Sequence, residues 1–248
     1  MALLWEKQTA DTRYEVRNAG KAVRLYTNGV FHSQYNPNQP VTGNIWDLLM
    51  LPAFFYRPDQ IKHVLLLGVG GGAVIQQLLH FIKPVSITGV ELDPVHLYVA
   101  QRFFKVKHAN VELVQADAVQ WLSEYAGPPF DMIIDDLCGG ESGEPVRAVP
   151  ATGKWVKLLA SHLSAKGVLV SNFITRQELN SSAYLQDKNL RKTFPSGYLL
   201  NMPGFENTIV SVLRKHTDSR QLRETLADIP ALNTRLKTCR LKYHIRQL

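Results

Sequence analysis

One stretch of this chain limits its possible folds more than any other. Residues 64–67 are four large apolar residues that run into a glycine-rich turn. Such a run, without polar alternation, is typical of a strand buried on both faces in the middle of a parallel sheet. Glycine permits positive φ and places no Cβ between the backbone and a ligand. The apolar spacing over 74–82 then predicts a helix whose first N–H groups point at the turn. Together they predict a ligand cradle; a glycine-rich connection without a ligand is the simpler alternative. The glycines of the turn are Gly68, Gly70, Gly71 and Gly72.

The length and the cysteine content limit the class of protein. A chain of 248 residues can form one large α/β domain, or one domain with a small appendage. Cys138 and Cys239 lie far apart without metal-ligand spacing, so we expect neither a zinc site nor a disulfide. The N-terminus lacks a signal-peptide pattern, and no apolar run approaches the length of a membrane span. These features favour a cytoplasmic protein with no metal and no membrane partner.

The positive charge is concentrated at one end of the chain. Residues 214–248 contain nine Lys or Arg against three Asp or Glu, a net charge of +6 out of +7 for the whole chain. This basic segment could attract nucleic acid or another polyanion. A solvated helix face is the simpler interpretation, because no aromatic residues are interleaved with the charges as in a nucleic-acid-binding motif.

Two kinds of pattern divide the chain into an N-terminal β-hairpin unit over 1–45 and an α/β domain over 46–248. In the first unit, apolar and polar residues alternate around an Asn28-Gly29 pair, which is a strong hairpin signal. A helix is expected over 44–55. From residue 62, strands alternate with helices, which predicts right-handed crossovers and a mostly parallel sheet. The expected strands are 63–67, 85–91, 111–114, 130–135 and 167–173, the expected helices are 72–81, 94–104, 118–125 and 152–163, and an antiparallel pair is expected over 197–202 and 207–213.

Polar residues follow the second and third predicted strands, at the edge where ligands of open parallel sheets bind. Glu91 ends the second strand about twenty residues past the turn, the spacing at which an acid hydrogen-bonds ribose hydroxyls. Asp117 and Ala118 follow the third strand. Asp117 fits a helix N-cap, and it could also accept a hydrogen bond from an adenine amino group.

The fourth predicted strand ends in two adjacent acids, Asp135 and Asp136, followed by a flexible lip over 137–140. Each carboxylate disfavours ionisation of the other, so placing the two side by side costs free energy. A purely structural role is therefore a weaker explanation for this pair than for a single surface acid. Consecutive strand residues face opposite sides of the sheet. We therefore expect one of the two to line the crevice, and we choose Asp136.

The glycine turn is compatible with two cofactor classes. Gly68, Gly70 and Ala73 fit the G-x-G-x-x-A pattern of nicotinamide dinucleotide sites. The additional glycines and the acid after the third strand favour S-adenosylmethionine instead. Nothing else in the sequence suggests hydride chemistry.

Taken together, the motifs resemble the spermidine synthase-like branch of the S-adenosylmethionine-dependent methyltransferase superfamily. The similarity spans roughly residues 10–175, and its main segments are 64–73, 90–94, 115–118 and 130–136. It implies a Rossmann-like class I methyltransferase fold, with helices on both faces of a twisted sheet, and a homodimer. It also implies that Asp136 is catalytic and that the cofactor is bound by Gly68, Gly70, Gly71, Gly72, Glu91, Asp117, Ala118 and Asp135.

The sequence departs from the polyamine aminopropyltransferases of this branch at three places. Gly71 stands where they have an Asp in the turn, and Gly139 stands where their active loop has its second Asp. The Tyr-Gln/His-Glu motif expected near residues 44–46 is absent. Compared with these enzymes, the sequence therefore retains the nucleoside-binding residues and lacks most of the polyamine-binding residues.

We expect an S-adenosylmethionine-dependent transferase, with methyl transfer to a small molecule, such as an amine, as the main hypothesis. The alternative is a polyamine aminopropyltransferase that uses decarboxylated S-adenosylmethionine. An Asp in the turn would repel the α-carboxylate of the intact donor, so Gly71 favours methyl transfer. A third hypothesis is a non-catalytic protein that binds nucleosides, or binds nucleic acid through its basic segment.

Overall fold

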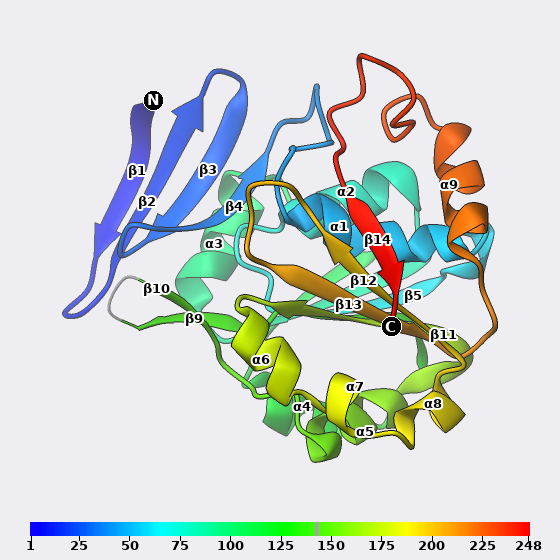
Figure 1. Cartoon of the computed structure of the whole chain (residues 1–248). Coiled ribbons are helices and arrows are strands. Elements are labelled where there is room, and N and C mark those ends of the chain that lie inside the picture. Colours follow the sequence, from blue (N-terminus) through cyan, green and yellow to red (C-terminus); the bar gives the residue numbers. More distant parts are fainter. Residues whose placement is uncertain (142–143) are drawn as a thin grey trace.

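The computed structural model describes residues 1–141 and 144–248, and it begins with a small antiparallel sheet (Figure 1). Its strands follow one another in the order β1, β2, β3, β4. The Asn28-Gly29 pair has positive φ at both residues and joins β3 to β4, as the hairpin signal predicts. The sequence patterns did not indicate β1, whose side chains are mostly exposed and do not alternate. The strands are β1 (Ala2–Gln8), β2 (Arg13–Ala19), β3 (Ala22–Thr27) and β4 (Val30–Tyr35).

A buried connection leads from this sheet into the rest of the chain. The helix expected over 44–55 is divided into α1 (Trp46–Met50) and the 3-10 helix η1 (Leu51–Phe55), followed by η2 (Pro58–Gln60). Pro52 has no N–H to donate to the preceding turn, which accounts for the change of helix type. All residues of α1 and η1 are buried.

The main sheet has eight strands in the order β7-β6-β5-β8-β11-β13-β12-β14. The five strands from β7 to β11 are parallel to one another, and the remaining three are antiparallel to their neighbours. The α/β class, the mostly parallel sheet and the antiparallel pair are confirmed. The strands are β5 (His63–Leu67), β6 (Ser86–Glu91), β7 (Val111–Gln115), β8 (Phe130–Asp135), β11 (Leu163–Phe173), β12 (Ser196–Asn201), β13 (Thr208–Leu213) and β14 (His244–Gln247).

Helices cover both faces of this sheet (Figure 1). Alternate residues of β5 belong to two separate cores: Val64 and Leu66 pack on one side, and Leu65 and Leu67 on the other. The first core includes α1, α2 (Ala73–Phe81), α3 (Pro94–Arg102) and α9 (Ser219–Ala227). The second includes α4 (Ala118–Glu124), α5 (Gly153–Ser161), α6 (Arg176–Ser181), α7 (Ala183–Gln186) and α8 (Leu190–Thr193).

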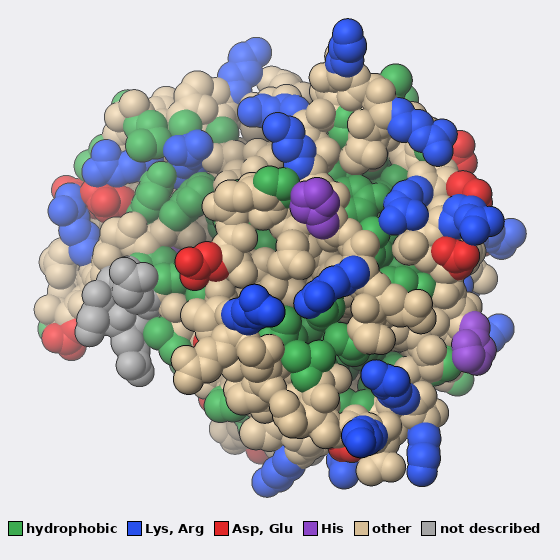
Figure 2. All heavy atoms as spheres, in the orientation of Figure 1, with side chains coloured by type: hydrophobic (Ala, Val, Ile, Leu, Met, Phe, Trp, Pro, Cys, Tyr) green, Lys and Arg blue, Asp and Glu red, His purple; other side chains and the backbone are tan. Residues whose placement is uncertain are grey.

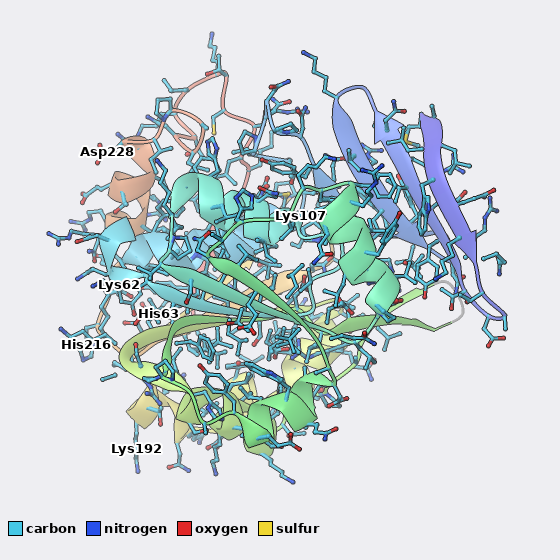
Figure 3. The ribbon with its side chains drawn as sticks, turned by 180° about the vertical axis from the view of Figure 1, so that it is seen from behind. Lys62, His63, Lys107, Lys192, His216 and Asp228 are labelled. Carbon is cyan, nitrogen blue, oxygen red and sulfur yellow. The ribbon has the colours of Figure 1, made fainter. Side chains whose placement is uncertain are left out.

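The chain order reverses between β5 and β8, which are neighbours in the sheet. Crossovers leave these strands in opposite directions, and this opens a crevice at their carboxyl ends. The N-terminal sheet lies at that end, whereas Lys62 and His63 mark the opposite, amino end of β5 (Figure 3). Tyr14 donates a hydrogen bond of 2.7 Å to Asp93 and so joins the two parts of the molecule.

Two segments differ from the expectations. Residues 138–140 of the predicted flexible lip belong to β9 (Cys138–Glu141), which pairs with β10 (Glu144–Arg147). The basic segment contains α9, a long loop and β14, so only part of it is a helix. Lys and Arg side chains are abundant on the face shown in Figure 2, but they are spread over it and do not form one patch. Among the described residues, no helix has the length and apolar character needed to span a membrane.

Candidate functional site

The glycine turn between β5 and α2 requires its glycines for two different reasons. At Gly68 the φ angle is +86°, and a Cβ would lie 2.3 Å from the carbonyl oxygen of Asp136. At Gly71 a Cβ would lie 2.7 Å from both Phe104 and Ser33. A Cβ at Gly72 would lie 2.6 Å from the side chain of Val106. Gly71 and Gly72 are thus needed for close packing behind the turn, and neither is among the residues that line the cavities described below.

Glu91 organises this turn. One of its carboxylate oxygens accepts hydrogen bonds of 2.9 Å from the N–H groups of Val69 and Gly70, and the other accepts one of 3.0 Å from Asp93. Burial raises the pKa of Glu91, but nearby His96, whose Nδ1 lies 3.9 Å from Oε2, and the backbone N–H groups outweigh burial and lower it to about 2. Glu91 is therefore ionised, and its first role is to fix the backbone of the turn.

His32 on β4 is a site residue that the sequence analysis missed. Its ring lies 5.2 Å from that of His96, centroid to centroid. Burial, with the charge of His96 as a smaller cause, lowers the pKa of His32 to about 4, so this ring is neutral at pH 7. No local motif marks His32, because only the packing of the N-terminal sheet brings it to the crevice.

Asp117 is the N-cap of α4, as the sequence predicts. Its Oδ1 accepts a hydrogen bond of 2.8 Å from the N–H of Gln120. Asp117 and Ala118 both face the crevice beside Glu91. The cap uses one carboxylate oxygen of Asp117, and the second oxygen is not part of the cap.

The adjacent acids at the end of β8 lie in different surroundings, as the strand geometry predicts. Asp135 is fully buried and forms an ion pair with Arg147 of β10, and it also accepts hydrogen bonds of 3.0 Å from Trp155 and 3.3 Å from Ser171. It lines neither cavity. This corrects its grouping with the cofactor-binding residues: a buried carboxylate needs a partner, and Arg147 supplies it.

Asp136 faces the crevice. Its Oδ1 accepts a hydrogen bond of 2.8 Å from the side-chain amide of Asn172, and the thiol of Cys138 lies 3.7 Å away. Burial raises the pKa of Asp136 to about 7; the hydrogen bond from Asn172 opposes this rise and the charge of Asp135 adds to it. Asn172 lies near the end of β11, so extending the strand-end rule to the fifth strand would have found it.

Two adjoining cavities surround the turn. The Asp136 cavity, of about 370 Å³, lies between the glycine turn, β4 and Asp136. The Asp117 cavity, of about 300 Å³, lies between the turn, Glu91 and Asp117. Each has a size typical of a small-molecule site. They share lining residues and are therefore parts of one crevice; the shared residues are Val30, His32, Gly68, Glu91, His96 and Cys138.

The side chains of the crevice offer carboxylates and amides to a ligand. Within residues 1–141 and 144–248, no group of three or more His, Cys, Asp or Glu side chains is arranged to hold a metal ion. The arrangement can hold a polar, nucleoside-sized ligand beside Asp117 and place a reacting group near Asp136.

A family profile, that of the Spermine/spermidine synthase domain, matches residues 47–223. Polyamine aminopropyltransferase 2 of Caldanaerobacter subterraneus is 30% identical over 106 residues, which are 42% of this chain and 35% of that protein. The eEF1A lysine and N-terminal methyltransferase homolog of Drosophila melanogaster is 30% identical over 148 residues, which are 56% of this chain and 21% of that protein. The chain thus aligns with about a third or less of the length of these relatives, which are transferases of two kinds.

Solved structures of both kinds share the fold. A probable spermidine synthase from Corynebacterium glutamicum superposes with a TM-score of 0.75 at 15% identity, covering 100% of this chain and 91% of its own. Human methyltransferase-like protein 13 in complex with SAH gives a TM-score of 0.62 at 21% identity, covering 73% of this chain and 87% of its own. The Rossmann-like methyltransferase fold is thereby confirmed.

Proposed function

Because the chain belongs to the spermine/spermidine synthase domain family, we propose that it is an S-adenosylmethionine-dependent transferase that moves the methyl group of the intact donor to a small acceptor. One observation carries this proposal. Three carboxylates line one crevice around the glycine turn: those of Glu91, Asp117 and Asp136. They lie at the ends of β6, β7 and β8, or just after them. A nucleoside sulfonium donor needs such polar groups along its length.

The Asp117 cavity suits the nucleoside part of the donor. A carboxylate offers about four lone-pair sites, and backbone N–H groups occupy three of those of Glu91. The remaining site can accept a hydrogen bond from a ribose hydroxyl. The second oxygen of Asp117 can accept one from the adenine amino group.

The bound donor would supply an electrophilic carbon on a positively charged sulfur. The chain must align a nucleophile with that carbon and exclude water. Asp136 would orient the nucleophile or accept its proton, and a pKa of about 7 suits a base that works near neutral pH. His32 is neutral at this pH and would not repel the cationic donor.

Two features of the turn support the intact donor over the decarboxylated one. Phe104 and Ser33 fill the space beside Gly71, so this position has no room for an acidic side chain. Ala73 and Val74 line the Asp136 cavity at the N-terminus of α2, and a helix N-terminus favours an anion. The α-carboxylate of the intact donor is such an anion, and the decarboxylated donor lacks it.

Aminopropyl transfer is the second candidate. It is supported by the family profile, by the relative from Caldanaerobacter, and by Asp136, which keeps the position of the catalytic acid in the resembling enzymes. The two candidates differ in donor, so donor binding separates them.

A calorimetric titration of the protein with each donor tests the proposal. We expect S-adenosylmethionine to bind more tightly than its decarboxylated form, and Asp117→Ala to weaken binding of both. Asp59→Ala, on the exposed η2, is a matched control that should change neither affinity. Tighter binding of the decarboxylated donor would favour aminopropyl transfer, and binding of neither would overturn both candidates.

A further inference from the structure

Part of the lining of the Asp136 cavity is an apolar wall. Phe31 and Trp46 form an edge-to-face corner, with ring centroids 5.0 Å apart at an interplanar angle of 88°. Ile45, Ile174 and the partly exposed ring of Phe205 extend this wall. Such a wall gains free energy by covering an apolar body, and aromatic faces also attract cations.

The polar end of the cavity presents hydrogen-bond acceptors. Asn207 donates a hydrogen bond of 3.1 Å to the side-chain oxygen of Asn172, and Asn172 donates one of 2.8 Å to Oδ1 of Asp136. This chain of bonds fixes the orientation of both amides. Within the described residues, no donor is bonded to Oδ2 of Asp136 or to the side-chain oxygen of Asn207, so this end suits a group with more than one polar hydrogen. A primary amine is such a group, whereas a hydroxyl has only one.

The charges of the cavity limit the acceptor further. Among the described residues that line it, none is Lys or Arg, so an acidic acceptor would find no cationic partner. The carboxylates among them are Asp136 and Glu91, and Glu91 is already bonded to three backbone N–H groups. A second amino group on the acceptor would therefore meet the aromatic wall without a carboxylate, and a cation–π contact contributes less than a hydrogen bond to a charged partner.

Resting on the proposed methyl transfer, we propose that the acceptor is a monoamine, with one primary amino group on an apolar body about the size of an aromatic ring. The amino nitrogen, as the free base, forms a bond to the transferred carbon while the carbon–sulfur bond of the donor breaks. The electron pair of that bond stays on sulfur, which becomes a neutral thioether. The proton of the resulting secondary ammonium passes to the carboxylate of Asp136.

Binding of model acceptors tests this proposal directly. The protein is saturated with S-adenosylhomocysteine and titrated in a calorimeter with 2-phenylethylamine, 2-phenylethanol and putrescine. We expect 2-phenylethylamine to bind at least about tenfold more tightly than either of the others, a difference of about 1.4 kcal/mol. Putrescine or 2-phenylethanol binding as tightly as 2-phenylethylamine would overturn the proposal.

A charge placed on the apolar wall provides a second readout. Phe205→Glu should weaken binding of 2-phenylethylamine and strengthen binding of putrescine, because it supplies a carboxylate for the second amino group. Leu236→Glu is the matched control: Leu236 is 43% exposed, against 37% for Phe205, and lines neither cavity. An equal effect of the two substitutions would contradict the assignment of the wall.

Turnover separates failure of this inference from failure of the proposed function. Incubation with S-adenosylmethionine should add one methyl group to 2-phenylethylamine, detected by mass spectrometry. If the donor binds and putrescine is the better acceptor, the monoamine proposal alone fails. If S-adenosylmethionine does not bind, the proposed function fails and the monoamine proposal fails with it.

Discussion

The two cavities of the crevice are built in different ways. The Asp117 cavity is organised mainly by hydrogen bonds to the backbone. Glu91 accepts hydrogen bonds from three backbone N–H groups, and Asp117 caps the N-terminus of α4. The Asp136 cavity is defined mainly by side chains from β4, α1, β11 and the loop before β13. Substitutions in the second cavity can change its chemistry without altering the backbone. The contrast therefore predicts a donor site that tolerates little change and an acceptor site that can be redesigned.

The largest effect should come from Asp136→Asn. This change keeps the shape of the side chain and removes the proton acceptor, so we expect kcat to fall by about 10²–10⁴-fold. Affinity for S-adenosylmethionine should stay the same, because the proposed donor contacts are the Asp117 cavity and the N-terminus of α2 and do not include the carboxylate of Asp136. Steady-state kinetics and a donor titration of the same preparation check both parts. A parallel loss of donor affinity would show that the two cavities do not act separately.

Substitution of Glu91 tests the organising role of this carboxylate. Glu91→Gln should weaken donor binding by about 10- to 100-fold, because hydrogen bonds to a charged group contribute about 1.5–3 kcal/mol and the new amide faces N–H donors. Glu91→Ala should weaken it further. Glu112→Gln on the neighbouring β7 is exposed and serves as a control. Donor affinity that stays at the wild-type value in Glu91→Ala would contradict the assignment.

Two glycines that replace acids of the resembling enzymes should respond differently to an introduced Asp. Gly71→Asp should destabilise the fold by about 1–3 kcal/mol, because its Cβ would overlap Phe104 and Ser33. A Cβ at Gly139 meets nothing within 4 Å, so Gly139→Asp should leave stability unchanged. Denaturant unfolding of both variants measures the difference. Equal stability of the two would mean that the space behind the turn can adapt.

The smallest effect concerns pH. The ordinary pKa of Asp136 is 3.8, and in the folded protein it is about 7. The folded state thus keeps this proton over a range where the unfolded chain releases it, so the stabilisation is complete below about pH 4 and is lost as the pH rises to 7. The Tm of the wild type relative to Asp136→Asn should fall between about pH 4 and pH 7 and level off above pH 7. A constant difference would contradict the raised pKa.

Local patterns predicted much of this molecule. The bounds of β5 and β8 agree with those expected, and the acids at the strand ends meet at one edge because parallel strands bring them there. Features that depend on distant contacts escaped prediction. Arg147 cannot be matched to Asp135 from spacing, and His32 reaches the crevice only through packing of a separate sheet. The strands β9 and β10 contain too few apolar residues to produce a recognisable strand pattern in the sequence.

The C-terminal strand β14 has a consequence for solubility. It pairs with β12, so Leu199 and Leu200 lie one strand inside the edge of the main sheet. The outermost strand instead carries polar residues such as Arg246. A chain cut after Leu213 would keep the pairing of β12 with β13 but leave its outer edge unpaired, and an exposed apolar edge is a template for strand addition by another molecule. We therefore expect removal of the last residues of the basic segment to promote aggregation, so charge reversal on its surface is a better probe of nucleic-acid binding than truncation.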